Sequence, residues 1–419
     1  MVVFGSILFF VLGLAAWAAA DRYYTANLQP TVSYAGRLVP TRDYQRELRY
    51  QLVRFYIELG VPPEFENDSR IASRKAEYEG ITLDKLIEDS ALERAAREAG
   101  VDVAGDVDAR YVADFSQFRS RHILVEADAE AADKDASDAA ALAKAQDLAA
   151  QLRAAPQDQE LWNRLAKESS SDPGSKDSGG ELGFVGKGQF VKEFEDAAAK
   201  LAVGGVSDPA KSSFGYHVIQ VQERRGPEES EVVKRFLASG FTTADIREHV
   251  RLDPLKDEFT RRAQEGAISS PTEQIHLAKI LVNTPPPQGA DLTAFTEGLR
   301  KISEIQTALE KGEEFGEVAK KHSEDSTAEQ GGDAGWLARG MLTDLSTEQE
   351  LFALAPGTNS RQFSTRTQTT FDCVLEKDAA RALTEDQITQ LKGSAFAYWL
   401  AREKERNGAR KLVKGFEFE

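Results

Sequence analysis

Two glycine pairs constrain the fold of this chain more than any other feature. Gly179-Gly180 and Gly331-Gly332 are each followed by an acidic residue, an apolar residue and a further glycine. Successive glycines of this kind indicate a backbone that needs positive φ angles or a very close approach to another segment. Because the same order occurs twice, the sequence predicts a duplicated domain.

The composition limits the classes of partner and cofactor. The chain has 419 residues, of which 41% are hydrophobic and 9% aromatic, so two or three domains with real cores are expected. Its net charge of −17 argues against nucleic acid, which needs clustered lysine and arginine. The single Cys373 excludes an internal disulfide, and the five histidines show no metal-ligand spacing. We therefore expect no metal, no cofactor and no nucleic-acid partner.

The N-terminal segment is free of charged residues from Val2 to Ala20, a length that just spans a bilayer. Trp17 and the tyrosines that follow the segment resemble an interfacial anchor, whereas its final run of alanines resembles a signal-peptidase site. Residues 1–20 are thus predicted to be a transmembrane anchor or a signal peptide. Either alternative makes the rest of the chain extracytoplasmic, as a membrane-anchored protein or as a secreted or periplasmic one.

Apolar spacing and turn signals divide the remainder into five parts. We predict an N-terminal helical module at 21–117, a first repeat at 118–226, a helical connector at 227–272, a second repeat at 273–380 and a C-terminal helix within 381–419. The last helix is too apolar to stand alone and is expected to pack on the N-terminal module near Leu52 and Phe55. Residues 126–148 are acidic and rich in alanine, and we expect them to form a surface extension before or into the first helix of the first repeat, solvated and mobile at its start.

An ordered series of short motifs gives the first repeat a family resemblance. The series runs Ser120-Arg121-His122-Ile123-Leu124-Val125, Asp172-Pro173-Gly174-Ser175, Gly179-Gly180-Glu181-Leu182-Gly183-Phe184, Gly188-Gln189-Phe190-Val191, Phe194-Glu195-Asp196-Ala197 and Ser213-Phe214-Gly215-Tyr216-His217-Val218-Ile219. It resembles the parvulin (PpiC-type, rotamase) family of peptidyl-prolyl isomerases. The whole chain resembles the SurA-type and PrsA-type exported foldases. The resemblance implies an α+β fold in which each repeat is a four-stranded antiparallel sheet with surrounding helices, and a chaperone-like N-terminal module.

The resemblance implies a catalytic group formed by His122, Asp172 and His217. The family places the two histidines on neighbouring strands, where they would share a hydrogen bond and fix one another's tautomer. Whether they act chemically or only form the floor of the site is left open by the sequence. Asp172 takes a family position for a polar group that faces the substrate amide, although an aspartate before Pro-Gly is also an ordinary turn residue.

The same resemblance implies an apolar site for the proline ring. Matching the family position by position, Leu182, Phe190 and Phe194 would line this pocket, and Phe214 would contact substrate. Ordinary core packing is the alternative reading, above all for Leu182. The loop after the first strand is acidic where phosphate-directed parvulins are basic, so the expected substrate is an unmodified, extended segment.

The second repeat departs from the motif series. Aligned on its first and last strands, it has Lys279 in place of His122 and Asp372 in place of His217, while Ala334 replaces Leu182 and Asp325 keeps the position of Asp172. We therefore expect this repeat to be a degenerate parvulin-like domain with impaired or absent activity.

These features together predict a peptidyl-prolyl cis/trans isomerase and folding chaperone. Its partners would be unfolded or extended polypeptides with X-Pro bonds, together with the membrane through the N-terminal helix. The main alternative is a non-catalytic holdase that uses parvulin folds only to bind clients. A structural envelope protein is a third class, but it would not need one complete pocket.

Overall fold

The computed structural model describes residues 16–59, 61, 69–102, 104–286 and 292–412. Contacts divide the chain into two compact units. One unit combines the residues up to Tyr44 with Leu83–Ala99 and the chain from Lys256 onward, and the other combines Gln45–Thr82 with Gly100–Leu255. Each unit therefore contains one of the two repeats together with helices from outside it.

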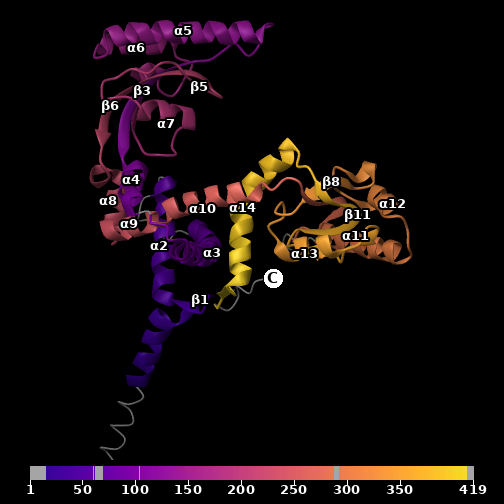
Figure 1. Ribbon diagram of the computed structural model, residues 1–419. Helices are drawn as coiled ribbons and strands as arrows, with labels where there is room; N and C mark the ends of the chain where they lie inside the picture. Colours follow the sequence, from indigo (N-terminus) through magenta and orange to yellow (C-terminus); the bar gives the residue numbers. More distant parts are fainter. Residues whose placement is uncertain (1–15, 60, 62–68, 103, 287–291, 413–419) are drawn as a thin grey trace, which may run out of the picture. The chain divides into compact units, whose positions relative to one another are not determined.

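The first repeat is built on an antiparallel sheet with the strand order β4-β3-β6-β5. Its elements are β3 (Gln117–Val125), α5 (Lys134–Ala154), α6 (Gln159–Ser169), η3 (Lys176–Ser178), β4 (Glu181–Val185), α7 (Lys192–Ala199), β5 (Ala210–Ser212) and β6 (Gly215–Arg225). Figure 1 shows α5 and α6 on one side of the sheet and α7 on the other. Since side chains alternate between the faces of a strand, β3 and β6 supply residues to both sides.

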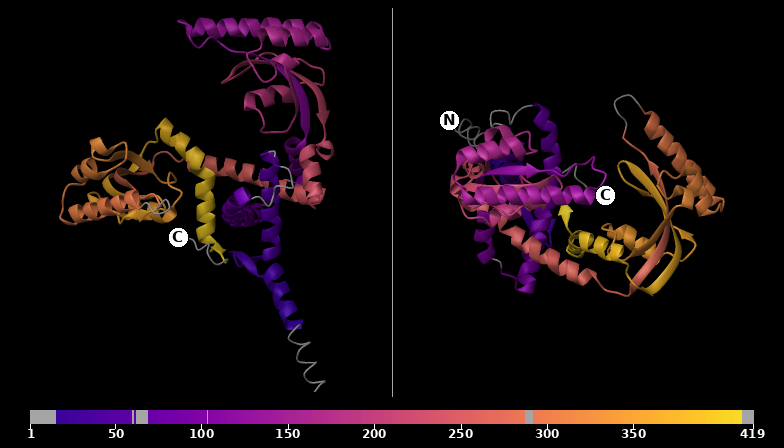
Figure 2. Two further views of the ribbon diagram at one scale, coloured as in Figure 1. Left: turned by 180° about the vertical axis from the view of Figure 1, so that it is seen from behind. Right: turned by 90° about the horizontal axis from the view of Figure 1, so that it is seen from above.

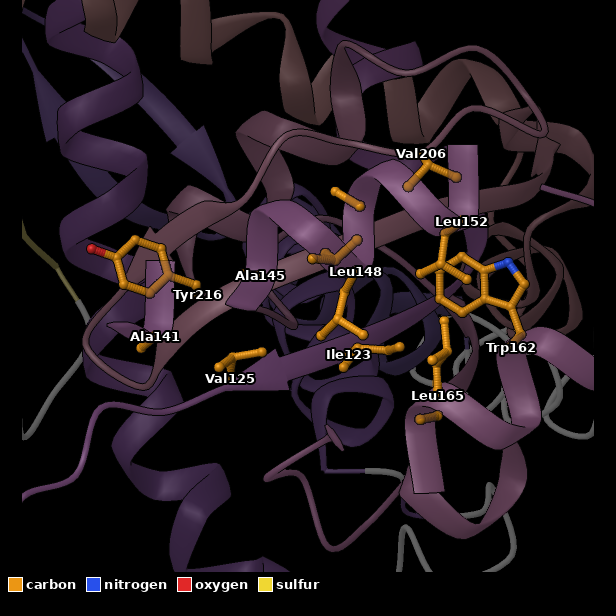
Figure 3. Close-up of a cluster of buried hydrophobic side chains, with 13 residues drawn as sticks. Ile123, Val125, Ala141, Ala145, Leu148, Leu152, Trp162, Leu165, Val206 and Tyr216 are labelled. Atoms are coloured by element: carbon orange, nitrogen blue, oxygen red, sulfur yellow. The ribbon is translucent and has the colours of Figure 1, made fainter. Parts of the chain in front are cut away.

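The side of this sheet that faces α5 and α6 is closed by a buried hydrophobic cluster, shown in Figure 3. Ile123 of β3 and Trp162 of α6 are both 0% exposed there. Ala141 and Ala145 of α5 are buried in the same cluster, because small side chains allow the helix to lie close to the strands. The prediction that residues 126–148 form a solvated extension is therefore wrong for the part that belongs to α5.

The rest of this unit is a group of helices with an aromatic core. These helices are α2 (Thr41–Glu58), α3 (Ser69–Ala99, as far as Thr82), α4 (Ala104–Phe115), η4 (Pro227–Glu229), α8 (Glu231–Ala238) and α9 (Thr243–Val250). Tyr50 of α2 stacks on Phe236 of α8 with ring centroids 4.6 Å apart, and on His249 of α9 at 3.6 Å. Phe55 of α2 lies beside Tyr78 of α3, at 5.3 Å between centroids.

The second repeat has a larger sheet than the first. Its elements are β7 (Thr272–Asn283), α11 (Thr293–Glu310), α12 (Phe315–His322), η5 (Ala328–Gln330), β8 (Asp333–Ala338), α13 (Leu345–Ala353), β9 (Thr358–Asn359), β10 (Phe363–Ser364) and β11 (Gln368–Arg381). The prediction of four strands is wrong here, because β9 and β10 both pair with β11 and make the sheet five-stranded. In Figure 2, where this repeat is orange, helices lie on both sides of the sheet.

The C-terminal region joins strands and helices from the start of the chain within the same unit. β12 (Arg410–Lys411) pairs with β1 (Pro30–Tyr34), which pairs with β2 (Arg37–Pro40). Trp399 and Leu400 of α14 (Glu385–Arg406) pack against a cluster that includes Leu83 and Ile87 of α3. Trp399 also stacks on Phe259 of α10 (Leu252–Ala267) at 5.1 Å. The expected partners Leu52 and Phe55 belong instead to the other unit.

Residues 1–15 of the predicted anchor lie outside the described residues. Residues 16–23 are helical and continue into a π-helix, η1 (Tyr24–Leu28). Trp17 and Tyr23 are 68% and 60% exposed. Within the described part of the chain, no helix has both the length and the apolar character that crossing a membrane requires.

Candidate active site

The glycine pair of the first repeat fixes the backbone beside His122. Gly180 has φ +77°, and a Cβ atom there would lie 2.0 Å from the carbonyl oxygen of His122. The carbonyl of Gly180 accepts a hydrogen bond of 2.8 Å from the backbone N–H of His122. Only glycine permits this approach, so the turn positions β3 and the aspartate loop against each other.

The two histidines are diagonal neighbours on the central strands. In the pairing of β3 with β6, His122 lies opposite Ile219 and His217 lies opposite Leu124. Residues two apart on a strand share a face, so both imidazoles lie on the side of the sheet covered by α7. Their Nδ1 atoms are 3.2 Å apart and the rings are nearly parallel, at 17°.

A series of hydrogen bonds runs through both rings in one direction. Nε2 of His122 lies 2.9 Å from Oδ2 of Asp172, which as a carboxylate can only accept, so this nitrogen carries the hydrogen. Nδ1 of neutral His122 is then an acceptor, and Nδ1–H of His217 donates to it. Nε2 of His217 is left to accept from the Ser212 hydroxyl at 2.7 Å. The backbone N–H of Phe214 in turn donates to that hydroxyl oxygen at 3.1 Å.

Asp172 is held by a local turn as well as by the imidazole. Its Oδ1 accepts from the backbone N–H of Gly174 at 3.0 Å, and its Oδ2 accepts from the hydroxyl of Ser175, a residue only 2% exposed. Burial alone would raise the pKa of Asp172, but the hydrogen bonds from His122, Ser175 and Gly174 outweigh it and lower the pKa to about 2. The carboxylate therefore remains ionised at all physiological pH values.

Both histidines are held in their neutral forms. Burial lowers the pKa of His122, and the neighbouring Asp172 opposes this shift only in part. Burial and the nearby His122 together lower the pKa of His217 to about 4. Two neutral rings agree with an Nδ1–Nδ1 contact that has room for one hydrogen only.

An apolar group lies on the same face of the sheet. Phe194 of α7 is 2% exposed and presents its edge to both imidazoles, at centroid distances of 5.7 Å to His122 and 5.5 Å to His217. Phe190 lies 4.7 Å from Phe194 between centroids, and Leu182 packs on the same cluster. The structure thus brings the three residues expected to form the proline pocket together beside the histidines.

Phe214 behaves differently from the other expected substrate contacts. Its side chain is 59% exposed and stands outside that apolar cluster. The two hydroxyls at the ends of the hydrogen-bond series, those of Ser175 and Ser212, were not predicted from the sequence to bond to the site residues. The position of Ser175 at the end of the Asp-Pro-Gly-Ser turn was a usable signal, because serine near an aspartate in a turn commonly bonds to it.

The second repeat keeps the backbone of the site, which allows position-by-position comparison. Gly332 has φ +81°, and its carbonyl accepts from the N–H of Lys279 at 2.8 Å, as that of Gly180 does from His122. In the pairing of β7 with β11, Lys279 lies opposite Asp372 and Leu281 lies opposite Thr370. Lys279 therefore occupies the position of His122, as predicted.

The predicted match of Asp372 with His217 is wrong. Thr370 occupies the position of His217, and Asp372 occupies that of Ile219. Backbone hydrogen bonds support the match of Asp372 with Ile219. The carbonyl of Ile219 accepts from the N–H of Ser207, and the carbonyl of Asp372 accepts in the same way from the N–H of Ser360.

An ion pair replaces the imidazoles in the second repeat. Nζ of Lys279 lies 3.0 Å from Oδ2 of Asp325, whose pKa is lowered to about 2 because hydrogen bonds from Thr327 and Lys279 outweigh its burial. Asp372 is 7% exposed, and burial raises its pKa to about 6 against the opposing effect of Lys279. No imidazole remains on this face of the second sheet among the aligned positions.

The apolar pocket is also altered in the second repeat. Ala334 lies at the register position of Leu182, one residue before the glycine that pairs with the first strand. Glu195 and Glu348 both accept from the N–H of a loop glycine, so the residue before each is equivalent, and Thr347 stands in place of Phe194. The aromatic wall beside the site is therefore absent from these equivalent positions.

The polar side chains of the first site are hydrogen-bonded to one another. The described residues contain no group of three or more histidine, cysteine, aspartate or glutamate side chains suited to a metal ion. The hydroxyls of Ser175 and Ser212 both donate within the series, to a carboxylate and to an imidazole. The site combines this hydrogen-bonded polar group with an aromatic cluster on the same face of the sheet, and such a combination is suited to contact an apolar ring and an adjacent amide.

Comparison with known families identifies both repeats. The family described as "PPIC-type PPIASE domain" matches residues 108–225 and again residues 280–375. The chain therefore contains two PPIC-type PPIase domains, in a mixed α/β architecture that also has helical regions, and the predicted parvulin resemblance is confirmed.

Relatives with curated names match parts of the chain. A foldase protein PrsA of Geobacillus kaustophilus is 49% identical over 83 residues, which are 20% of this chain and 30% of that protein. A chaperone SurA of Chromohalobacter salexigens is 41% identical over 107 residues, 26% of this chain and 22% of that protein. The crystal structure of peptidylprolyl isomerase PrsA from Bacillus cereus matches with 21% identity and a TM-score of 0.27, over 61% of this chain and 80% of that one. This chain thus spans less than half the length of the curated relatives.

Proposed function

We propose that this protein, as a chain with two PPIC-type PPIase domains, is a peptidyl-prolyl cis/trans isomerase and folding chaperone whose activity resides in residues 118–226. The observation that carries the proposal is the complete series from Ser212 through both histidines to Asp172, beside Phe194. The second domain lacks both histidines and the aromatic side chain, which supports assigning the activity to the first.

The reaction needs no bond to the enzyme. An X-Pro bond prefers trans by only about 0.5–1 kcal/mol, but rotation must overcome a barrier of roughly 18–20 kcal/mol because it breaks amide resonance. Phe190, Phe194 and Leu182 would hold the proline ring and exclude water, while the neutral histidines would form the floor under the twisting imide. Both imidazoles have lowered pKa values, so they would stay neutral, and the proposed mechanism transfers no proton to them.

The substrate class we propose is an unmodified, extended polypeptide. Glu126, Asp128 and Glu130 follow β3 as exposed carboxylates, and they would repel a phosphorylated residue before proline. The exposed ring of Phe214 is suited to contact the residues that flank the proline. A chaperone role towards such segments is supported by the relatives named as foldases and chaperones.

The second domain is proposed to bind or to serve as architecture rather than to catalyse. Lys279 is already paired with Asp325, so this side chain is committed to an internal contact. A non-catalytic holdase remains the alternative for the whole chain, and it requires the first domain to be inactive as well.

The location we propose is the cell membrane, with residues 1–20 as a single-pass anchor and the domains on the extracytoplasmic side. The charge-free run from Val2 to Ala20 and the exposed rings of Trp17 and Tyr23 support this assignment. Cleavage after Ala20, which would release a secreted or periplasmic protein, is the alternative. Mass spectrometry of the mature protein distinguishes them, since an N-terminus at Asp21 would contradict the anchor.

Equivalent aspartates in the two domains provide the test of the isomerase proposal. The full chain is assayed for cis/trans exchange of a short X-Pro peptide by NMR, in the wild type, in Asp172→Asn and in the matched control Asp325→Asn. We expect Asp172→Asn to remove most of the exchange activity and Asp325→Asn to leave it within about twofold, since only the first carboxylate bonds to an imidazole. No exchange activity in the wild type would favour the holdase, and equal losses in the two variants would contradict the assignment to the first domain.

A further inference from the structure

Two exposed carboxylates border the first candidate site without taking part in its hydrogen-bond series. Glu126 follows β3 directly, and Glu193 is the second residue of α7. Neither side chain makes an ion pair or a hydrogen bond with another residue that the structure describes. Both carboxylates are therefore free to meet a charged group that arrives with the substrate.

Strand alternation places Glu126 on the face of the sheet that carries the histidines. Val125 and Ala127 both pack on the buried cluster between the sheet and α5 and α6. The side chain of Glu126, which lies between them in sequence, therefore points to the opposite face, the one that holds His122. Its backbone N–H donates to the hydroxyl of Ser171 at 3.4 Å, so the residue also lies beside the aspartate loop.

The neighbouring strand leaves this end of the site uncovered. Gly215 begins β6 with φ +127°, and a Cβ atom there would lie 2.5 Å from the carbonyl oxygen of Val125 and 3.1 Å from the Cα atom of Glu126. Only glycine fits at this position, so no β6 side chain separates Glu126 from Ser212, which pairs with Gly215 on β5. Glu126 thus borders the end of the site where Ser212 bonds to His217.

Glu193 borders the same end of the site from α7. Phe194, the next residue, lies 5.5 Å from His217 between ring centroids. Burial and the nearby His122 lower the pKa of His217, and the carboxylates of Asp172 and Glu193 oppose this shift. At His122 only Asp172 opposes the lowering of the pKa. The charge of Glu193 therefore acts at the end of the site that Glu126 also borders.

The lysines of the adjoining elements α7 and β5 are already paired elsewhere. Lys192 of α7 forms an ion pair with Asp196 of the same helix. Lys211 of β5 pairs with Asp138 of α5 at 2.7 Å, on the other face of the sheet. Neither lysine neutralises the two free carboxylates, so the surface around this end of the site is acidic.

We propose that Glu126 and Glu193 make the first domain select X-Pro bonds in which residue X is lysine or arginine. When the proline ring contacts Phe194, the imide lies over the histidines, and residue X, which is attached to the imide carbon, lies next to His217. A cationic side chain at X would be attracted by both carboxylates, whereas an acidic one would be repelled by them and by Asp172. This inference rests on the proposed isomerase function and adds the sequence preference of that site.

The test compares peptides that differ only at residue X. Exchange of X-Pro peptides with lysine, glutamine or glutamate at X is measured by NMR with the full chain, and each catalysed rate is divided by the uncatalysed rate of the same peptide. At roughly 0.02 M salt we expect the lysine peptide to exceed the glutamate peptide by about fivefold or more in kcat/KM. This ratio should fall below about twofold at roughly 0.5 M salt, because salt screens exposed charges.

Variants assign the preference to the two carboxylates. Glu126→Gln and Glu193→Gln should each lower the lysine-to-glutamate ratio by about twofold, and the double variant should bring it below about twofold. Glu160→Gln is the matched control, since it removes an exposed carboxylate from α6 on the other face of the sheet and should keep the ratio. A peptide with glutamine at X and a lysine at a distant position should exchange no faster than the glutamine peptide, although the net charge of −17 attracts both lysine peptides.

Two kinds of failure are distinguishable in this experiment. Equal rates for the lysine and glutamate peptides in the wild type would overturn the preference while the isomerase proposal stands. Equal effects of Glu126→Gln, Glu193→Gln and Glu160→Gln on the ratio would overturn it too, because the attraction would then belong to the whole chain. A wild type that accelerates the exchange of no peptide would overturn both proposals.

Discussion

Replacement of Ser212 by alanine tests whether the hydrogen-bond series through the histidines has the direction assigned to it. The hydroxyl of Ser212 donates to Nε2 of His217 at 2.7 Å, and His217 is only 5% exposed. Without the hydroxyl this buried nitrogen loses its donor, which costs about 1–3 kcal/mol. If about 1 kcal/mol of that cost reaches the transition state, the rate of X-Pro exchange falls about fivefold.

The adjacent serine is the control for this experiment. Ser213 is exposed, so Ser213→Ala changes the same stretch by the same atoms without touching His217. The assay combines NMR exchange rates for an X-Pro peptide with nitrogen-15 spectra of the imidazoles in the full chain. In the wild type His217 should be the Nδ1–H tautomer and His122 the Nε2–H tautomer, and Ser212→Ala should populate the second tautomer of His217. Unchanged tautomers and rates in both variants would refute the assigned series.

Three further perturbations follow from the same geometry. Exchange activity should be flat from about pH 8 to pH 6 and should fall towards pH 4. The pKa of His217 is lowered from 6.5 to about 4, so the neutral ring stabilises the folded site fully above pH 6.5, and this contribution is lost as acid protonates the ring and turns Nε2 into a donor. A rise in activity on acidification would contradict this assignment. Phe194 is 2% exposed, so Phe194→Ala would open a cavity that costs about 3–5 kcal/mol of stability, and Phe194→Leu is the better probe. Phe194→Leu should lower the exchange rate clearly while it changes the melting temperature little. An unchanged exchange rate would show that Phe194 does not contact the substrate. Deletion of residues 384–419 should destabilise the strands and helices that α14 covers and should weaken the suppression of client aggregation. Exchange of a short peptide by the first domain should be retained. A deletion variant with the melting temperature and the client protection of the full chain would contradict this prediction.

The sequence was sufficient for the parts of the fold that depend on local backbone chemistry. Each glycine pair predicted a backbone turn with positive φ, and Gly180 and Gly332 occupy such turns, where a side chain would collide with the first strand. The prediction for residues 126–148 was less accurate, because part of this segment belongs to the core and not to a surface loop. Alanines in α5 were interpreted as surface residues because composition does not reveal that a helix lies close enough to a sheet to need small side chains.

The error in the closing strand of the second repeat has a specific physical cause. Asp372 was matched with His217, whereas the register matches Thr370 with it, a difference of two residues. A slip of one residue moves apolar side chains to the wrong face of a strand and is easily recognised, but a slip of two preserves both faces. The alternation of apolar residues therefore could not fix the register, which depends on cross-strand pairing and on the backbone bonds of Ser207 and Ser360.

The corrected register changes how the loss of activity in the second domain should be understood. Thr370 has no ring to meet a histidine at position 279, so Lys279→His alone would place an imidazole beside Asp325 with no partner at its other nitrogen. Asp372 adds a buried carboxylate directly opposite position 279. The positive charge of Lys279 opposes the negative charge of this carboxylate, and Lys279→His would remove that positive charge. Removing one partner of a buried charged group is more costly than replacing both. In the second domain Lys279 thus offsets the charges of both Asp325 and Asp372, and restoring an active site would require positions 279, 347, 370 and 372 to change together.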